Sequence, residues 1–173
     1  MIEGSNVNLR LFRESDLEEY YSYVSKLSEI GEYWPRRLNS FSSMQKQFQE
    51  NGFWSEVWGK MLITDKEDRM LGNINYFKGI PYVDGYEIGY RIFRPEGRGR
   101  GYTTEAVNLF VDYFFSIYPI QRLQAGINPA NTGSRRVLEK CGFQKEGRLR
   151  KAYFHRGEYF DVELYSLIRG ELK

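Results

Sequence analysis

A short segment rich in glycine and arginine carries the residues whose types and spacing are best suited to chemistry. Residues 94–105 read Arg-Pro-Glu-Gly-Arg-Gly-Arg-Gly-Tyr-Thr-Thr-Glu, between an alternating segment and one with helical periodicity. Glycines at positions 97, 99 and 101 allow backbone N–H groups to approach an anion without obstruction by Cβ atoms. The following helix directs unpaired N–H groups and its positive dipole end toward the same point. Four arginines add positive charge nearby, namely Arg91, Arg94, Arg98 and Arg100. The segment therefore predicts a phosphate-binding loop.

Two other nucleotide-binding patterns are less favoured by this segment. A P-loop ends in lysine followed by serine or threonine, whereas Gly101 is followed by Tyr102. A dinucleotide-binding loop has glycines at its first, third and sixth positions, and that spacing does not occur here. A flexible basic hairpin turn remains the alternative, because glycine-rich turns are common.

Length and composition predict one folded domain that spans residues 1–173. Hydrophobic residues make up 41% of the chain and aromatic residues 17%, which suits a substantial core and argues against disorder. The net charge of +2 is too small to indicate binding of nucleic acid over a broad surface. Basic residues gather instead around 91–100 and 145–156, which fits a small polyanion and predicts no nucleic-acid partner.

The single cysteine and the single histidine limit the available chemistry. One cysteine allows neither an intramolecular disulfide nor a zinc cluster, so we expect no metal and interpret Cys141 as a buried thiol at a helix end. We expect His155 to be a solvated turn residue, because Arg156 and Gly157 follow it, and this disfavours a Ser-His-Asp mechanism. No apolar run approaches the ~20 residues needed to span a bilayer, and no signal peptide is visible. These features predict a cytoplasmic protein without a membrane partner.

The periodicity of apolar residues predicts an α+β fold. Helices are expected at about 15–27, 42–50, 103–118 and 132–141. The third of these has a stripe of apolar residues at helical spacing, namely Ala106, Leu109, Phe110, Tyr113, Phe114 and Ile117. Strands are expected at about 7–12, 54–64, 70–78, 85–93, 121–127, 147–154 and 159–168. The helical crossover between the fourth and fifth strands joins parallel strands, so the sheet is mixed and otherwise antiparallel.

Two motifs at related places in this fold resemble those of the GCN5-related N-acetyltransferases. The first matches the family's acetyl-CoA pyrophosphate motif through Arg98, Gly101 and Thr103, with a departure at Thr103. The second matches an asparagine, two intervening residues and then a serine or alanine, through Asn131 and Ser134, followed by a helix that ends in Glu-Lys-Cys-Gly-Phe. The run Gly-Tyr-Thr-Thr-Glu-Ala and the tail over 147–162 are similar to the ribosomal-protein alanine acetyltransferase branch.

The resemblance implies a three-layer α/β arrangement within the α+β class, with a mixed, mostly antiparallel sheet of about seven strands and helices on both faces. In the family the fourth and fifth strands, here 86–93 and 121–127, splay apart around acetyl-CoA. Arg135 or Arg136 would reach the phosphates, although a solvated helix face explains one of them equally well. The implied residues for acetyl-CoA are Ile92, Phe93, Arg94, Arg98, Gly99, Arg100, Gly101, Tyr102, Thr103, Thr104, Asn131, Ser134 and Arg136.

The resemblance also implies catalytic roles. Many family members protonate the leaving thiolate with a tyrosine seven residues after the motif asparagine, but Leu138 stands there. In the ribosomal branch a serine has this role, and Ser134 matches it, although a serine in a first helical turn also satisfies backbone groups. The branch's glutamate base corresponds to Tyr153, so we assign the base to Glu87, acting through water. A salt bridge of Glu87 with Arg91 or with a neighbouring strand is the competing interpretation.

The acceptor is expected at the segment over 31–54 and at the final hairpin. Aromatic residues there predict a wall for an amine, namely Tyr33, Trp34, Trp54 and Tyr153, although core positions explain them equally well. Four acidic residues suggest a cationic acceptor such as a polyamine or aminoglycoside, although solvated helix faces explain such charges as well, namely Glu29, Glu32, Glu50 and Glu56.

The predicted function is acetyl-CoA-dependent transfer of an acetyl group to a primary amine by direct attack in a ternary complex. The amine is a protein N-terminus or a small molecule, and the protein is expected to be a monomer or a homodimer. A catalytically silent CoA-binding or regulatory module is the alternative, because Leu138 and Tyr153 depart from the catalytic pattern.

Overall fold

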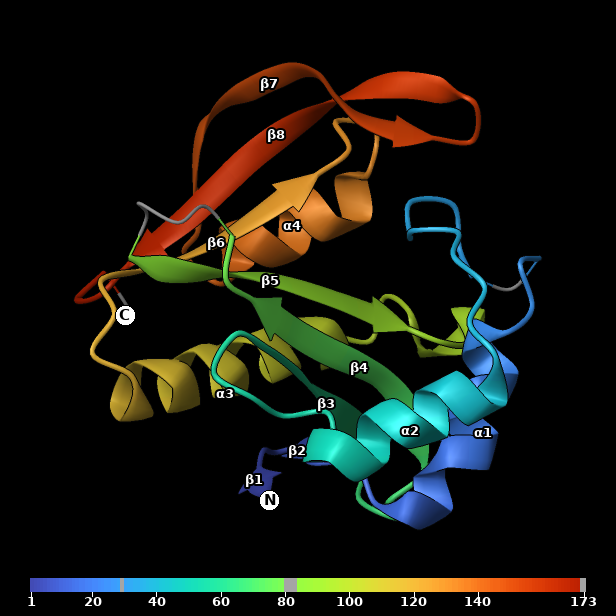
Figure 1. The fold of residues 1–173 in the computed structure, drawn as a ribbon. Helices are drawn as coiled ribbons and strands as arrows, with labels where there is room; N and C mark the ends of the chain where they lie inside the picture. Colours follow the sequence, from blue (N-terminus) through green and yellow to red (C-terminus); the bar gives the residue numbers. More distant parts are fainter. Residues whose placement is uncertain (29, 80–83, 172–173) are drawn as a thin grey trace.

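One mixed β-sheet with helices on both faces organises the residues that the computed structural model describes, which are 1–28, 30–79 and 84–171 (Figure 1). The strands are β1 (Ile2–Glu3), β2 (Asn8–Arg10), β3 (Trp58–Thr64), β4 (Met70–Phe77), β5 (Gly85–Ile92), β6 (Arg122–Ile127), β7 (Gln144–His155) and β8 (Glu158–Ile168). Their order across the sheet is β1-β2-β3-β4-β5-β6-β8-β7, and every neighbouring pair is antiparallel except β5 and β6. The predicted mixed, mostly antiparallel α+β sheet is confirmed.

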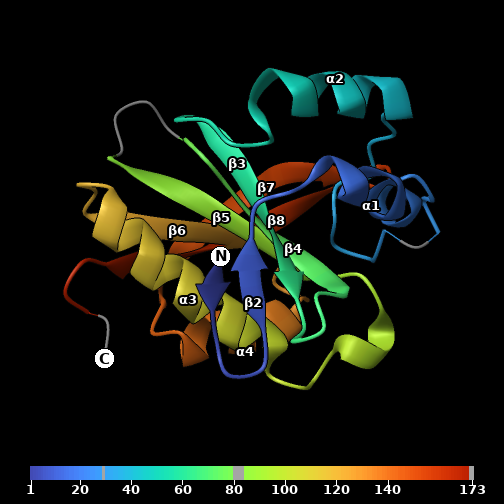
Figure 2. The same cartoon turned by 90° about the horizontal axis from the view of Figure 1, so that it is seen from below.

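The helices cover the two faces of this sheet. They are α1 (Leu17–Val24), α2 (Phe41–Asn51), α3 (Tyr102–Ile117) and α4 (Thr132–Lys140). Figure 2 shows α3 and α4 on one side of the sheet and α1 and α2 on the other. Each face therefore has its own hydrophobic core. Phe110 and Phe114 of α3 are fully buried in one cluster, and Phe53 and Leu62 are fully buried in the cluster beneath α1 and α2.

Several predicted boundaries differ from the structure. The described part of the sheet has eight strands, because Ile2–Glu3 pairs with β2. The third strand begins at Trp58 instead of residue 54, since the backbone N–H of Ser55 bonds the carbonyl oxygen of Trp58 and forms a turn. The first helix ends at Val24, and the carbonyl oxygen of Leu27 accepts a hydrogen bond from the Arg36 side chain instead of continuing the helix.

The buried stripe of α3 is also rotated from its prediction. Val107 and Val111 are fully buried beside Phe110 and Phe114, whereas Ile117 is 45% exposed. The sequence places apolar residues on more than half of this helix, so spacing alone does not define which of them face the sheet.

The pairing of β5 with β6 is short and defines the opening that the site occupies. The two strands are parallel and pair only from Gly85 with Arg122 to Glu87 with Gln124. Beyond that point β5 continues to Ile92 and β6 to Ile127, and Figure 1 shows the two strands diverging. The facing edges of both strands therefore present backbone N–H and C=O groups without a strand partner, as an added extended segment requires.

Candidate active site

The glycine and arginine segment forms a loop that ends at the N-terminus of α3. Gly99 and Gly101 have φ angles of 73° and 81°, in the left-handed region that glycine adopts without strain. A Cβ atom at either position would meet nothing within 4 Å, so both glycines face open space. Gly101 is the residue that caps α3, and no side chain caps the helix there. The first N–H groups of α3 are thus available to an anion, and the residues fit the diphosphate that the sequence predicts.

The predicted acetyl-CoA residues divide among the surfaces around this loop. A cavity of about 410 Å³ is lined by Ile92, Phe93, Arg98, Gly99, Thr103, Asn131 and Ser134. Arg100 and Tyr102 line a separate depression beside Arg94, and Gly101 and Thr104 line another beside α3. Arg136 is exposed on α4, whereas Arg135 donates to the carbonyl oxygen of Pro129 at 2.6 Å and pairs with Glu163 at 3.2 Å. Arg135 therefore has a structural partner, and Arg136 is the arginine free to face solvent.

A second cavity of about 320 Å³ lies in the opening between β5 and β6. It contains both predicted catalytic residues, Glu87 and Ser134, together with Asn131. Since Asn131 and Ser134 line both cavities, the cavity beside the loop and the cavity between the strands adjoin each other. The two motifs, 28 or more residues apart in the sequence, thus meet at one place.

Asn131 and Ser134 have distinct tasks at the start of α4. The Asn131 side chain accepts a hydrogen bond from the backbone N–H of Ser134 at 3.1 Å, so Asn131 caps the helix as predicted. The Ser134 hydroxyl lies 3.0 Å from the hydroxyl of Tyr90 on β5. Burial raises the pKa of Tyr90, which keeps its hydroxyl protonated and able to donate.

Tyr90 is the site residue that the sequence did not indicate. It lies on the strand face with Ile88 and Ile92, and alternation alone suggests a core position for that face. The family's tyrosine position on α4 is Leu138, which is fully buried in the core beneath the sheet. Tyr90 thus brings a phenolic hydroxyl to Ser134 from the strand instead of from the helix. No sequence motif indicates this position for a tyrosine, because the contact depends on the distance between β5 and α4.

Glu87 lies where the pairing of β5 and β6 ends. The Gln124 amide donates to its carboxylate at 3.3 Å, and the backbone N–H of Gly126 is a further donor. Burial is the largest influence and raises the pKa of Glu87. The competing interpretation, an ion pair with Arg91, does not occur in the described residues. Arg91 instead contacts the rings of Trp34 and Phe93, with its guanidinium carbon 5.3 and 4.9 Å from the ring centres.

The loop between α1 and α2 closes over this opening. Tyr33 and Trp34 line both cavities, and Figure 1 shows the loop rising toward the end of the β7–β8 hairpin. The His155 Nε2 atom lies 2.7 Å from the carbonyl oxygen of Glu32, and the rings of His155 and Tyr153 stack with centres 5.8 Å apart. The expectation of a solvated His155 is wrong, since this side chain is buried at the contact between loop and hairpin. Tyr153 also lines the cavity between β5 and β6.

Trp54 does not share the position predicted for it. It packs against Tyr76 and Tyr113, with ring centres 4.8 and 6.4 Å away, in the core beneath α3. It lines neither cavity, because the turn before β3 directs it to the α3 face of the sheet. Among the acidic residues, Glu56 is exposed and lines neither cavity, and Glu29 lies outside the described residues.

The remaining titratable and metal-ligating groups define what else the site contains. Cys141 is buried, its Sγ atom donates to the carbonyl oxygen of Thr104 at 3.5 Å, and burial raises the pKa of the thiol to about 12. That pKa is incompatible with a reactive thiolate at neutral pH.

Within residues 1–28, 30–79 and 84–171, no three acidic, histidine or cysteine side chains form a group that could hold a metal ion. No helix in those ranges is long and apolar enough to cross a membrane.

Comparison with known proteins defines the class to which this fold and site belong. Residues 6–144 match the family described as Acetyltransferase (GNAT) domain. The chain belongs to this family and is an N-acetyltransferase that acts on amines.

Relatives of similar length support this membership. The chain is 39% identical to the uncharacterized N-acetyltransferase YoaA of Bacillus subtilis, over 98% of this chain and 97% of that protein. It is 31% identical to the probable N-acetyltransferase YjcK of the same organism, over 99% and 98% of the two chains.

Solved structures share the fold at lower identity. The spermidine N-acetyltransferase of Vibrio cholerae, in complex with CoA and spermine, has a TM-score of 0.83 at 20% identity and covers 97% of this chain and 98% of its own. RimL, the ribosomal L7/L12 α-N-protein acetyltransferase in complex with CoA, has a TM-score of 0.82 at 21% identity, over 95% of each chain. The two differ in the amine that each acetylates, so the shared fold does not define the acceptor.

Proposed function

We propose that residues 1–173 act as one cytoplasmic domain that transfers an acetyl group from acetyl-CoA to a primary amine by direct attack in a ternary complex. The observation that carries this proposal is the end of β5–β6 pairing at Glu87 and Gln124, beside the Ser134 hydroxyl and the glycine loop. The opening offers unpaired strand edges to the pantetheine arm. The loop and the N-terminus of α3 offer N–H groups to the diphosphate, and Asn131 lies between them.

The acetyl group would then lie in the cavity between the diverging strands. Unpaired N–H groups on the inner edge of β5 are suited to polarise the thioester carbonyl, because charge that develops on oxygen is stabilised by fixed donors. The amine nitrogen attacks the carbonyl carbon, the C–N bond forms, and the C–S bond to CoA breaks. The linked hydroxyls of Tyr90 and Ser134 donate a hydrogen bond to the departing sulfur.

Glu87 is the group suited to receive the proton that the amine loses. Because burial raises its pKa, Glu87 takes up a proton at a pH closer to neutral than an exposed carboxylate does. Gln124 and Gly126 hold the carboxylate in the cavity, and a water between Glu87 and the amine completes the path. Tyr153, which replaces the branch's glutamate, contributes a wall of the cavity.

The second candidate is a CoA-binding module without turnover. Leu138 favours it, because the family's tyrosine position is filled by a buried apolar residue. The Tyr90–Ser134 pair favours turnover instead, because it supplies a hydroxyl at the same opening.

Release of free CoA from acetyl-CoA with a panel of primary amines tests the proposal. The panel contains peptides with free N-termini, a polyamine and an aminoglycoside. We expect release with at least one amine, and a rate roughly 10²-fold lower in the double variant Ser134→Ala/Tyr90→Phe. Tight binding of acetyl-CoA with no release above hydrolysis for any amine would support the silent module instead.

A further inference from the structure

A third cavity, of about 510 Å³, lies between α1, α2 and the loop that joins them. It adjoins the proposed active site, because Trp34 and Pro35 also line the cavity between β5 and β6. It also shares Arg91 with the cavity beside the glycine loop. A part of the acceptor that extends from the opening between the strands toward the α1 and α2 face would therefore lie beside this cavity.

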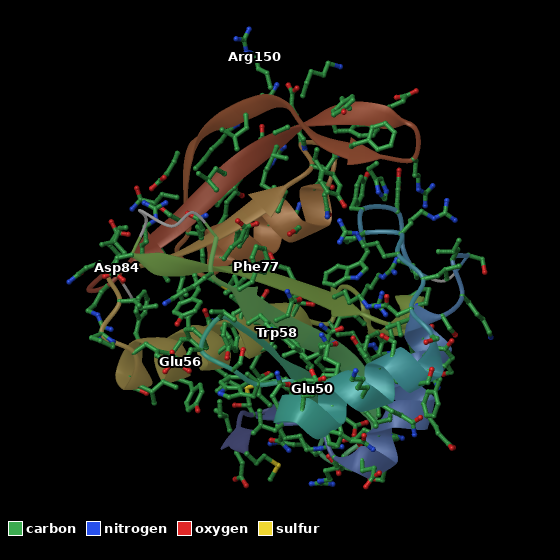
Figure 3. All side chains as sticks on the ribbon, in the orientation of Figure 1. Glu50, Glu56, Trp58, Phe77, Asp84 and Arg150 are labelled. Carbon is green, nitrogen blue, oxygen red and sulfur yellow. The ribbon has the colours of Figure 1, made fainter. Side chains whose placement is uncertain are left out.

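The charges around this cavity are strongly unbalanced. Four cations line it, namely Arg37, Lys46, Lys60 and Arg91, against one carboxylate, Glu50. None of the four forms an ion pair in the described residues, where the salt bridges belong to other arginines and lysines. Figure 3 shows Glu50 on α2, the helix that borders the cavity. Glu32 does not line this cavity, so the acidic residues that favoured a cationic acceptor do not dominate it.

Arg91 is the most constrained of these cations. Its guanidinium contacts two aromatic rings, those of Trp34 and Phe93, and donates one hydrogen bond, from Nη2 to the carbonyl oxygen of Tyr23 at 3.2 Å. Its Nε atom is buried and has no hydrogen-bond partner in the described residues. Arg91 is half-buried, and a partly desolvated cation without a counterion is costly, so an anionic ligand group would offset that cost.

Lys60 approaches the same cavity from β3. Its ammonium lies 4.2 Å from the centre of the Phe53 ring and 5.1 Å from that of Tyr20, whose hydroxyl accepts at 3.5 Å. These contacts hold the ammonium in place without neutralising it. Two positioned cations thus face one space, and Arg37 and Lys46 add to the same potential at its rim.

The spacing along β5 relates this positive cavity to the reacting amine. Arg91 lies two residues beyond Gly89 on the same strand face, a separation of roughly 7 Å. Gly89 lines the cavity in which the acetyl group would lie. One acceptor molecule would therefore reach both places if several bonds separated its anionic group, at Arg91, from its amine, near Gly89.

From this arrangement we infer that the acceptor is a primary amine with a carboxylate several bonds away, as in a short peptide with an acidic second residue. The inference rests on the proposed function and names its substrate class. Polyamines are disfavoured by the same charges, because each additional ammonium would meet Arg37, Lys46, Lys60 or Arg91.

The test compares matched acceptors in the CoA-release assay. Ala-Glu-Ala-Ala, Ala-Gln-Ala-Ala and Ala-Lys-Ala-Ala, all amidated at the C-terminus, differ only in the second side chain. Free glutamate and spermidine are two further acceptors, which compare a free amino acid with a polyamine. We expect kcat/KM for the Glu peptide to exceed that for the Lys peptide by about tenfold or more, and the preference to weaken with added salt.

Variants assign the preference to this cavity. Arg37 and Lys46 line only the α1–α2 cavity among the cavities described above. We expect Arg37→Glu and Lys46→Glu to reduce the ratio of kcat/KM for the Glu peptide to that for the Lys peptide by about tenfold, with an unchanged Kd for acetyl-CoA. Arg150→Glu is the matched control with the same change of charge, because Figure 3 shows Arg150 projecting from the β7–β8 hairpin, away from α2, and its ratio should stay unchanged. Release with spermidine and the Lys peptide alone would overturn this inference and leave the proposed function intact. No release from any amine would remove both.

Discussion

The hydroxyl oxygens of Tyr90 and Ser134 lie 3.0 Å apart, one from β5 and the other from the first turn of α4. The Tyr90 hydroxyl is also 3.2 Å from the carbonyl oxygen of Ser134 and donates to it. Strand and helix are thus joined by polar contacts at the place where β5 and β6 separate. This pair supplies the hydroxyl that the buried Leu138 does not.

The first prediction concerns this pair. Ser134→Ala and Tyr90→Phe should each lower kcat by roughly 10²-fold, because each removes a hydroxyl suited to stabilise the departing sulfur. The double variant should lose little more than either single one, since the two hydroxyls act as a unit. Steady-state kinetics with acetyl-CoA and the best amine from the panel measures this. Ser116→Ala on α3 is the control, because its hydroxyl bonds only the carbonyl oxygen of Tyr113 within that helix. A higher Kd for acetyl-CoA with an unchanged kcat would instead assign the pair a role in binding.

The second prediction concerns Glu87 and pH. Burial raises its pKa, so activity should fall as pH decreases through that raised pKa. Glu87→Gln should lower kcat by roughly 10²-fold and abolish this acidic limb of the pH profile. A limb that persists in the variant would assign it to another group.

Glu87 has an opposite effect on stability. Because its folded-state pKa is raised above the unfolded value, it stabilises the fold at low pH, and this contribution is lost as pH rises through the folded pKa. Glu87→Gln should therefore increase the free energy of unfolding at pH 7, measured by urea denaturation, while it lowers activity. A loss of stability at pH 7 would show that the carboxylate has a favourable partner.

The third prediction concerns the glycine loop. Gly101→Val should weaken acetyl-CoA binding by more than tenfold, because a β-branched residue does not readily adopt a φ of 81° and its side chain would fill the space in front of the α3 N-terminus. Gly170→Val is the matched control, since Gly170 also has a positive φ, of 94°, and open surroundings. Calorimetric titration with CoA measures binding. Equal affinity in both variants would contradict the assignment of this loop to the diphosphate.

Much of the fold was predictable because it depends on local patterns. Alternation and helical spacing defined the strands and helices to within a few residues, and Asn131 at the start of α4 was identified as its cap. The burial of His155 was not predictable, because its partner is a carbonyl oxygen of Glu32 in a loop 123 residues away. The sequence leaves Trp54 open between the acceptor wall and the core, and the turn before β3 places it in the core.

The candidate site was partly predictable for the same reason. Motifs indicated the loop around Gly101 and the Asn131–Ser134 turn, since both are contiguous in sequence. Tyr90 and Arg91 face opposite sides of one strand and gain their importance from α4 and from the α1–α2 loop. Such positions depend on tertiary distances and have no local signature.

The fourth prediction concerns a buried carboxylate that ties β8 to its neighbours. Glu163 is 1% exposed and pairs with Lys145 at 2.6 Å, Arg148 at 2.8 Å and Arg135 at 3.2 Å, and these cations lower its pKa to about 2. Glu163→Gln should cost about 2 kcal/mol of folding stability at pH 7, because charge-assisted hydrogen bonds are lost. The lowered pKa means that this stability is present above the unfolded pKa and is lost as pH falls toward 2. Wild type and variant should therefore converge in stability under acidic denaturation. A constant difference at every pH would contradict the pairing.

The most direct test of the central claim measures CoA release and acetylated amine together in one reaction. Acetyl-CoA labelled in its acetyl group, an amine panel and the wild-type protein should yield CoA and labelled amide in equal amounts. The Ser134→Ala/Tyr90→Phe variant should bind acetyl-CoA and yield both products at a rate roughly 10²-fold lower. Labelled acetate in place of labelled amide, or binding without any product from the wild-type protein, would contradict an acetyltransferase that acts by direct attack of an amine.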